Sequence, residues 1–337
     1  MEDYRDLLRD LQWLSIRPRV DEELRDLFDS IVKMYLAWEK SLTSFQRLEL
    51  RILCLKSMQN TSLVYKHSLR FLTVRIDFSD PFTRWSYMFV FMMRHVHLVF
   101  YALDQAVYEK ILKVIPSGRP TNVCMIGGGP GSDVLGLGLF LMKHGCTSKL
   151  TDQVNVLDKC QEWSDSWSQL HRFLPERYSK GIPDVNYHSF DYLNNKLTPE
   201  QLGCVEDASI VTMIKSLSPV AAWLKTKPIH QSYVRGAYGQ LKCVISEWHS
   251  VYEILKAMKP GAFLLYIDNE TGPQRQILMN TVKFLKFKII FDRIFRGVRM
   301  PSHFFSSTSR DLMNTLNYKP CTTAGTNEVI ILKKEVS

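Results

Sequence analysis

The stretch VCMIGGGPGSD, residues 123–133, decides the fold. Its first four residues are apolar and predict a short strand, and the glycine run then turns the chain into a helix that begins at Ser132. Glycine tolerates positive φ and leaves no side chain between the backbone and a ligand. A strand, a glycine-rich turn and a helix in this order predict a ligand site at the carboxyl end of a parallel strand.

The spacing of the glycines separates this turn from other nucleotide-binding loops. A dinucleotide fingerprint needs Gly-x-Gly-x-x-Gly, whereas here the glycines are Gly127, Gly129 and Gly131. A Walker loop needs Gly-Lys followed by Ser or Thr, which this turn lacks. Asp133 follows closely and would repel a bare pyrophosphate, but its carboxylate suits a cationic ammonium group.

Beyond residue 119 the sequence alternates between strand and helix patterns. This alternation predicts a mainly parallel sheet that is covered on both faces. The last two strands have no long helix between them and predict an antiparallel edge. We expect strands at 122–126, 153–157, 185–190, 208–214, 262–268, 288–295 and 328–334, and helices at 132–143, 162–173, 244–258 and 273–287.

Residues 1–118 read as helical and predict an N-terminal domain distinct from the domain 119–337. Apolar residues recur at helical spacing over 7–14 and 24–35. Thr43 and Gln46 predict a capping box, and Asp80-Pro81 predicts the start of a long helix that reaches about residue 114, broken at most once.

The apolar run 87–103 within this long helix contains three polar side chains, Arg94, His95 and His97. Charged and polar residues are costly in a membrane span, so we expect a buried core helix and no membrane partner. We also expect both histidines, and Cys124 inside the first strand, to pack in the core.

Acidic residues end the second and third predicted strands. Asp158 ends the second strand, where a carboxylate can accept hydrogen bonds from ribose hydroxyls. Asp191 ends the third strand beside Tyr192 and is placed to meet an adenine amino group. Since ligands of open α/β sheets bind at the carboxyl ends of the strands, we expect both acids near the glycine-rich turn.

Together these motifs resemble those of the class I methyltransferases that use S-adenosyl-L-methionine, over residues 119–337. The resemblance implies a Rossmann-like α/β fold with a seven-stranded sheet in the order 3-2-1-4-5-7-6, strand 7 being antiparallel. It also implies a role for each residue of the motifs. Gly127, Gly129 and Gly131 would border the methionine part, Asp133 would bind its amino group directly or through water, Asp158 would hold the ribose, and Asp191 with Tyr192 would hold the adenine.

The composition of the 337-residue chain is that of an ordinary globular protein, 45% hydrophobic and 23% charged, which excludes collagen-like and disordered classes. Seven cysteines without a Cys-x-x-Cys motif predict reduced thiols and neither a disulfide framework nor a metal site. The start, MEDYRD, is acidic and polar, unlike a secretory signal or a mitochondrial presequence. We therefore expect a cytoplasmic or nuclear protein.

Basic residues exceed acidic residues by nine, and segment 275–299 contributes much of this excess. Such a segment can follow a phosphate backbone, although it can equally be a solvated face. Its members are Arg275, Lys283, Lys286, Lys288, Arg293, Arg296 and Arg299, with Asp292 as the one acid.

The sequence leaves three functions open. The first is an S-adenosylmethionine-dependent methyltransferase acting on RNA, because the Gly-Gly-Gly-Pro-Gly form also resembles that of some eukaryotic ribosomal-RNA uridine methyltransferases. The second is a methyltransferase for a small molecule or a protein, in which the helical region encloses the substrate and Arg84 or Tyr87 faces the pocket. The third is a non-catalytic binding protein that keeps the fold.

The sequence does not identify a catalytic residue. The fourth strand leads into KSLSP, residues 215–219, rather than into the Asp/Asn-Pro-Pro-Tyr/Phe signature of amino methyltransferases. Lys215, Ser216 and Glu247 are candidates by location alone. A base is needed only where the methyl acceptor carries a proton of high pKa.

Overall fold

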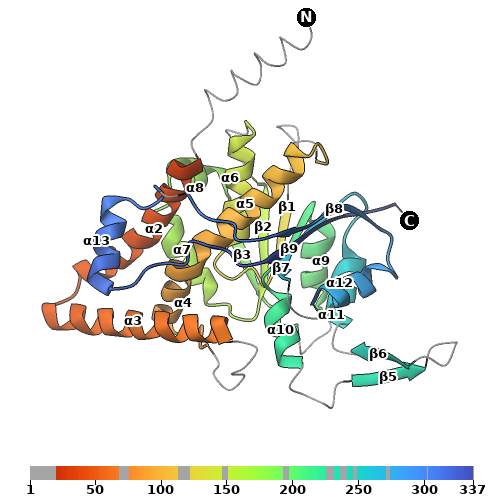
Figure 1. Cartoon of the computed structure of the whole chain (residues 1–337), viewed down its shortest axis with the longest axis horizontal. Coiled ribbons are helices and arrows are strands. Elements are labelled where there is room, and N and C mark those ends of the chain that lie inside the picture. The colour runs from red at the N-terminus through yellow and green to blue at the C-terminus, as the bar shows by residue number, and fades with distance from the viewer. Residues whose placement is uncertain are drawn as a thin grey trace, which may run out of the picture.

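A twisted seven-stranded sheet with helices on both faces forms the centre of the protein (Figure 1). The structure is a computed structural model. It describes residues 20–67, 76–112, 122–145, 151–192, 197–224, 231–235, 241–245, 249–270, 274–301 and 303–336. The predicted helix over 7–14 lies outside these ranges.

The strand order of the sheet is β3-β2-β1-β4-β7-β9-β8. Strands β3, β2, β1, β4 and β7 pair in parallel, whereas β9 is antiparallel to both of its neighbours. Because β5 and β6 lie outside this sheet, β7, β8 and β9 are its fifth, sixth and seventh strands along the chain. The order is therefore the predicted 3-2-1-4-5-7-6 with an antiparallel seventh strand. The bounds are β1 Asn122–Ile126, β2 Gln153–Asp158, β3 Val185–Ser189, β4 Ile210–Ile214, β7 Phe263–Asn269, β8 Phe287–Phe295 and β9 Asn327–Lys334.

The side chains of the central strand pack alternately into two separate hydrophobic cores, one on each face of the sheet. On β1, Val123 and Met125 join the core on one face, whereas Cys124 and Ile126 join the core on the other, since successive strand residues point to opposite faces. The first core also holds α6 (Ser132–Lys143), α7 (Trp163–His171) and the N-terminal helices. The second holds residues of α9 (Pro199–Asp207), α10 (Leu217–Leu224), α11 (His249–Ala257) and α12 (Gln274–Val282).

The N-terminal region is helical, as predicted, and shares the first core with the sheet. Both predicted start signals are present. The Thr43 and Gln46 side chains bond to each other's backbone N–H, and Asp80 accepts from the Thr83 N–H at 2.7 Å. The helices are α2 (Val20–Lys40), α3 (Ser44–His67), α4 (Pro81–Tyr87) and α5 (Met93–Tyr108), with a π-helical segment at Met88–Met92 joining the last two.

The continuous helical stretch Pro81–Tyr108 is long and apolar enough to cross a membrane, but 89% of its apolar window is buried inside the protein. His95, His97 and the apolar residues between 87 and 93 are all buried. This burial confirms the prediction of a core helix. The helix ends at Tyr108 rather than near 114, and Lys110 just beyond it has a φ of +58° that no longer follows the helix.

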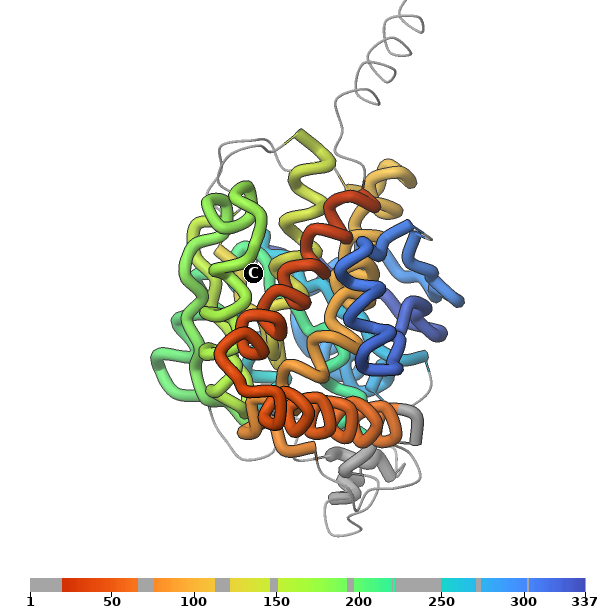
Figure 2. The backbone as a smooth tube through the Cα atoms, turned by 90° about the vertical axis from the view of Figure 1, so that its left-hand side faces the viewer, coloured from red at the N-terminus to blue at the C-terminus, as the bar shows by residue number. Residues whose placement is uncertain are grey.

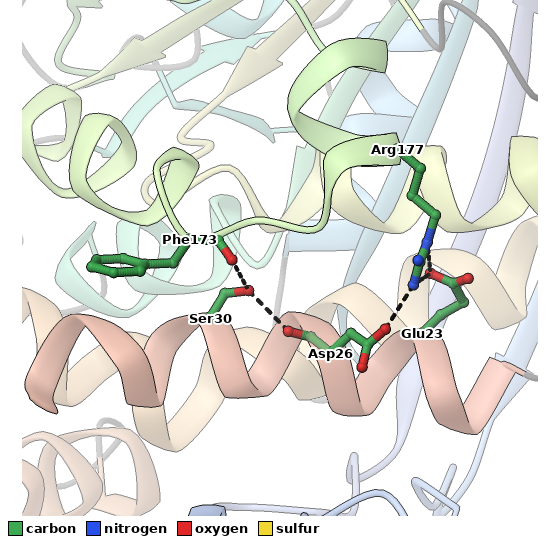
Figure 3. Close-up of polar contacts among 5 residues, drawn as sticks. All are labelled: Glu23, Asp26, Ser30, Phe173 and Arg177. Atoms are coloured by element: carbon green, nitrogen blue, oxygen red, sulfur yellow. Dashed lines mark hydrogen bonds and ion pairs between the residues drawn. The ribbon is translucent and has the colours of Figure 1, made fainter.

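Polar contacts fasten α2 to the segment that follows α7 (Figure 3). The Arg177 guanidinium of α8 (Glu176–Gly181) donates to the Glu23 carboxylate at 2.6 Å and to Asp26 at 2.8 Å. The Ser30 hydroxyl lies within hydrogen-bonding distance of the carbonyls of Asp26 and Phe173. Glu23 is almost fully buried, so its ion pair with Arg177 offsets the cost of removing a carboxylate from water.

The opposite side of α2 packs against the last helix of the chain, α13 (Ser307–Leu316), as Figure 2 shows. The Ser306 hydroxyl, which caps α13, donates to the Asp29 carboxylate at 2.7 Å. Phe304 is buried against Phe28, with ring centroids 5.2 Å apart. The C-terminal part of the chain therefore packs against the N-terminal helix α2, and the sheet and the helical region form one packed body.

Three expectations about the elements are wrong. Residues 244 and 245 belong to a strand, because β5 (Gln231–Arg235) and β6 (Leu241–Ile245) form a separate antiparallel pair, and α11 begins only at His249. Helix α12 ends at Val282 rather than at Phe287, since β8 begins there. The strands β8 and β9 do pair antiparallel, but the ten-residue α13 lies between them in the chain.

Candidate functional site

The glycine-rich turn follows β1 and has the backbone that only glycine adopts easily. Gly127, Gly129 and Gly131 have φ values of +68°, +46° and +83°. A methyl group on Gly127 would lie 2.6 Å from the Ser216 Cβ, and one on Gly131 would lie 2.7 Å from the Trp167 ring. Both conformation and packing therefore require glycine at 127 and 131.

Asp158, the last residue of β2, is bonded directly to this turn. One of its carboxylate oxygens accepts from the Gly129 N–H at 2.9 Å, and the other accepts from the Cys160 N–H at 2.9 Å. Burial raises the pKa of the Asp158 carboxyl, and the backbone N–H groups of Cys160, Gly129 and Lys159 lower it in part. The structure therefore bonds Asp158, which is predicted to hold the ribose, directly to the glycine-rich turn, which is predicted to border the methionine part.

Asp133, in the first turn of α6, is fully buried. Its carboxylate accepts from the Thr212 hydroxyl of β4 at 2.5 Å and from the Ser132 hydroxyl at 3.1 Å. Burial raises its pKa to about 7. These contacts fix α6 to β4 behind the turn, and the predicted contact of Asp133 with a ligand amino group stays a prediction.

Asp191 and Tyr192 follow β3 and make different contacts. The Asp191 carboxylate forms an ion pair with Lys159, the residue after Asp158, at 2.6 Å. Tyr192 is buried in the second core, and its hydroxyl lies 3.1 Å from the Ser216 hydroxyl after β4. The sheet thus brings Asp191 close to Asp158, while Tyr192 ties the ends of β3 and β4 together. Their predicted roles toward adenine stay predictions.

Aromatic rings cover the turn, which the sequence did not reveal. Trp163 of α7 lies 3.7 Å from the position of a methyl group on Gly129. The rings of Phe78 and Tyr87 pack on Trp163 with centroids 5.2 and 5.7 Å away, and Tyr65 packs on Tyr87 at 5.7 Å. The N-terminal helical region therefore forms part of the site.

Arg84 holds this cover in place and also lines a hollow between α2, α4 and α7. Its guanidinium is buried and donates to the Phe78 and Ser79 carbonyls at 2.8 and 2.7 Å and to the Ser166 hydroxyl at 2.8 Å. These bonds join the loop that carries Phe78 to α7. Of the two residues expected to face a pocket, Tyr87 is therefore the one beside the turn.

The loop after β4 lies directly across from the turn. Lys215 has a φ of +56° and donates from its amine to the side-chain oxygens of Asn269 and Asn327. Asp268, at the end of β7, is fully buried and accepts from the N–H groups of Leu217 and Ser218. Lys215 and Ser216 thus lie at the predicted edge of the sheet, whereas Glu247 lies outside the described residues.

Two hollows lie away from the turn. One of about 610 Å³ is lined by Trp38 of α2, Arg84 of α4 and Gln169 of α7. Another of about 680 Å³ lies beside the sheet edge formed by β3 and is lined by His188, Glu200 and neighbouring residues. Neither of these two hollows is lined by the glycines of the turn.

No protein-family model and no curated protein matches the chain. Solved structures similar to it include a protein from Listeria monocytogenes described as a putative class I S-adenosylmethionine-dependent methyltransferase, at 12% identity and a TM-score of 0.40 over 94% of this chain and 89% of that one. The N-methyltransferase NodS from Bradyrhizobium japonicum, in complex with S-adenosyl-L-homocysteine, is 12% identical with a TM-score of 0.37, over 79% of this chain and 96% of that one. An rRNA methylase from Streptococcus thermophilus is 12% identical with a TM-score of 0.34, over 72% of this chain and 98% of that one.

The order and directions of the strands identify the fold of the chain. The chain has the class I methyltransferase fold. Its glycine-rich turn follows the central strand β1, and its acids end the neighbouring strands β2 and β3, which is where ligands of open α/β sheets bind.

Proposed function

We propose that this protein is an S-adenosylmethionine-dependent methyltransferase. The observation that carries the proposal is the hydrogen bond from the Gly129 N–H to the Asp158 carboxylate. It fixes Asp158, the acid that would bind the ribose, beside a bare glycine backbone, so a nucleoside with an amino-acid tail would meet both of its expected partners in one place.

The residues present fit this cofactor. A carboxylate offers about four acceptor positions, and the backbone N–H groups of Gly129, Cys160 and Lys159 use three of them, which leaves an acceptor for a ribose hydroxyl. When bound, S-adenosylmethionine supplies a methyl group on a positively charged sulfur. The glycine turn would border the methionine part, and the rings of Trp163, Phe78 and Tyr87 would exclude water from the transfer.

We propose RNA as the methyl acceptor, supported by the seven bases of segment 275–299, which lie on α12, on β8, in the turn between them and just after β8. All seven except Arg275 are exposed. Arg275 and Arg293 form ion pairs with Asp292 and Glu109, which lowers the charge available to a partner. Lys283, Lys286 and Lys288 are the residues we expect to contact phosphates.

A small-molecule acceptor is the second candidate, and the aromatic cover favours it. Rings from the N-terminal region lie on the turn itself, as they would around an enclosed substrate. The two acceptors differ in size and charge, so the fate of a labelled methyl group separates them.

The test uses S-adenosylmethionine with a labelled methyl group and a fractionated cell extract. The proposal expects label in one fraction with the wild-type chain and none with Asp158→Ala, since the ribose would lose its acceptor. Label in RNA supports the first candidate, and label in small molecules supports the second. No label in any fraction, together with no stabilisation of the chain by S-adenosylhomocysteine, would refute both.

A charge-reversal series tests the RNA contact directly. Lys283→Glu with Lys286→Glu should weaken RNA binding and reduce the dependence of log affinity on log salt by roughly 0.7 for each lost phosphate contact. Lys56→Glu, an exposed lysine on α3, is the matched control. Equal affinities in the double variant and the wild type would contradict this role.

A further inference from the structure

Lys215 adopts a backbone conformation that is unfavourable for lysine. Its φ of +56° lies in the left-handed region, which costs an ordinary residue about 1–2 kcal/mol. The conformation is held by the bond from the Lys215 N–H to the Ile267 carbonyl at 2.7 Å. Such strain is concentrated at functional sites, and here it lies one residue before Ser216, which abuts Gly127 of the turn.

The amine of Lys215 has neutral hydrogen-bond acceptors. It donates to the side-chain oxygens of Asn269, at 2.6 Å, and Asn327. An uncharged amine has two hydrogens and one lone pair, so two amide oxygens suit it, and its third tetrahedral position holds the lone pair. The geometry therefore accommodates a lysine that can accept a proton.

The charges around Lys215 oppose one another. Burial and the Arg94 guanidinium lower its pKa, the Asp268 carboxylate raises it, and the outcome is a pKa of about 8. The charge of Lys215 also acts on His95, and burial keeps the pKa of His95 well below its ordinary value, so that ring is neutral. An amine of this kind is partly unprotonated at neutral pH, unlike an ordinary lysine.

Charges from both ends of the site act on the aromatic cover. Burial raises the pKa of Tyr65 to about 12, and the charges of Arg94, Asp158 and Asp268 all act on it. Tyr65 packs on Tyr87 of the aromatic cover, with ring centroids 5.7 Å apart. Ser216, the residue after Lys215, is packed against Gly127 of the turn, so the loop that carries Lys215 borders the site directly.

We propose that Lys215 is the general base of the methyl transfer and accepts the proton of a weakly acidic N–H or O–H nucleophile. This inference rests on the proposed function and narrows its acceptor to such groups. The nucleophile forms a bond to the methyl carbon, and the carbon–sulfur bond breaks with its electron pair left on sulfur. The proton moves to the Lys215 nitrogen, where Asp268 stabilises the resulting ammonium.

The first test needs no substrate. Trace acetylation of the full wild-type chain with acetic anhydride across a pH series, read by mass spectrometry, reports when each lysine amine loses its proton. The inference expects Lys215 to reach half of its maximal reactivity near pH 8, against about 10.4 for an ordinary lysine. A Lys215 that behaves as an ordinary lysine overturns the inference.

The second test compares variants. Lys215→Met and Lys215→Asn should each lower methyl transfer by about 10²–10⁴-fold and leave the affinity for S-adenosylhomocysteine unchanged. Asparagine adopts the left-handed region more easily, so the second variant separates loss of the base from loss of folding. Lys110→Met is the matched control, since exposed Lys110 has a similar φ of +58° far from the turn, and it should keep full activity.

The outcomes separate the two proposals. A wild-type chain that does not bind S-adenosylhomocysteine refutes the proposed function, while the acetylation series still decides the state of Lys215. A wild-type chain that transfers methyl groups, with Lys215→Asn equally active, overturns the role of Lys215 alone.

Discussion

Replacing Gly131 by alanine should lower the free energy of unfolding by about 2–5 kcal/mol. Two costs add at this position. The φ of +83° costs an alanine about 1–2 kcal/mol, and the new methyl group would lie 2.7 Å from the Trp167 ring, where overpacking costs about 1–3 kcal/mol. Trp167 is buried in the first core, so its ring cannot move aside freely.

Gly261 provides the matched control for this prediction. It has nearly the same φ, +84°, and no described residue lies within 4 Å of a methyl group added there. Gly261→Ala should therefore show the conformational cost alone, about 1–2 kcal/mol. Urea unfolding of both variants measures the difference, with an unchanged denaturant slope as the condition for comparing midpoints. Equal losses at 131 and 261 would refute the steric argument.

Three further predictions concern the polar contacts of the fold. Because the pKa of Asp133 is raised from 3.8 to about 7, the folded state holds a proton that the unfolded chain has lost, and stability falls as the pH rises through that window. The free energy of unfolding of Asp133→Asn, measured with urea, should therefore rise by up to roughly 4 kcal/mol relative to that of the wild type between pH 4 and pH 8. A difference between the two free energies that does not change with pH would contradict this. Arg177→Met should cost about 1.5–3 kcal/mol by leaving the buried Glu23 carboxylate without its partner, and Glu23→Gln in the same chain should recover part of the loss; no recovery would count against the ion pair. Asp80→Ala should lower stability by about 1 kcal/mol, because the Thr83 N–H loses its cap, and an unchanged melting temperature would disprove that contribution.

The fold was predictable where sequence signals are local. Both β1 and α6 have the bounds expected from the apolar run, the glycine turn and the residues after it. The caps at Thr43 and Asp80 were also predictable, since each depends on residues three positions apart. The pair β5–β6 was not, because Val244 and Ile245 continue the apolar pattern of the helix that follows them.

The site was predictable in its residues but not in its contacts. The sequence placed Asp158 at the end of β2, yet the bond from Gly129 joins residues 29 positions apart and depends on how β1 and β2 pair. The ring of Phe78 over Trp163 depends on how the helical region packs on α7. The positive φ of Lys215 could not be foreseen, because lysine rarely adopts it and no sequence signal marks it.

Calorimetric titration of the chain with S-adenosylhomocysteine tests the central claim most directly. Saturable binding at one site per chain is expected, with loss of that binding in Asp158→Ala, while Gly261→Ala, which alters a turn outside the site, keeps it. The claim is contradicted if the wild-type chain gives no saturable heat, or if a folded Asp158→Ala variant binds as tightly as the wild type.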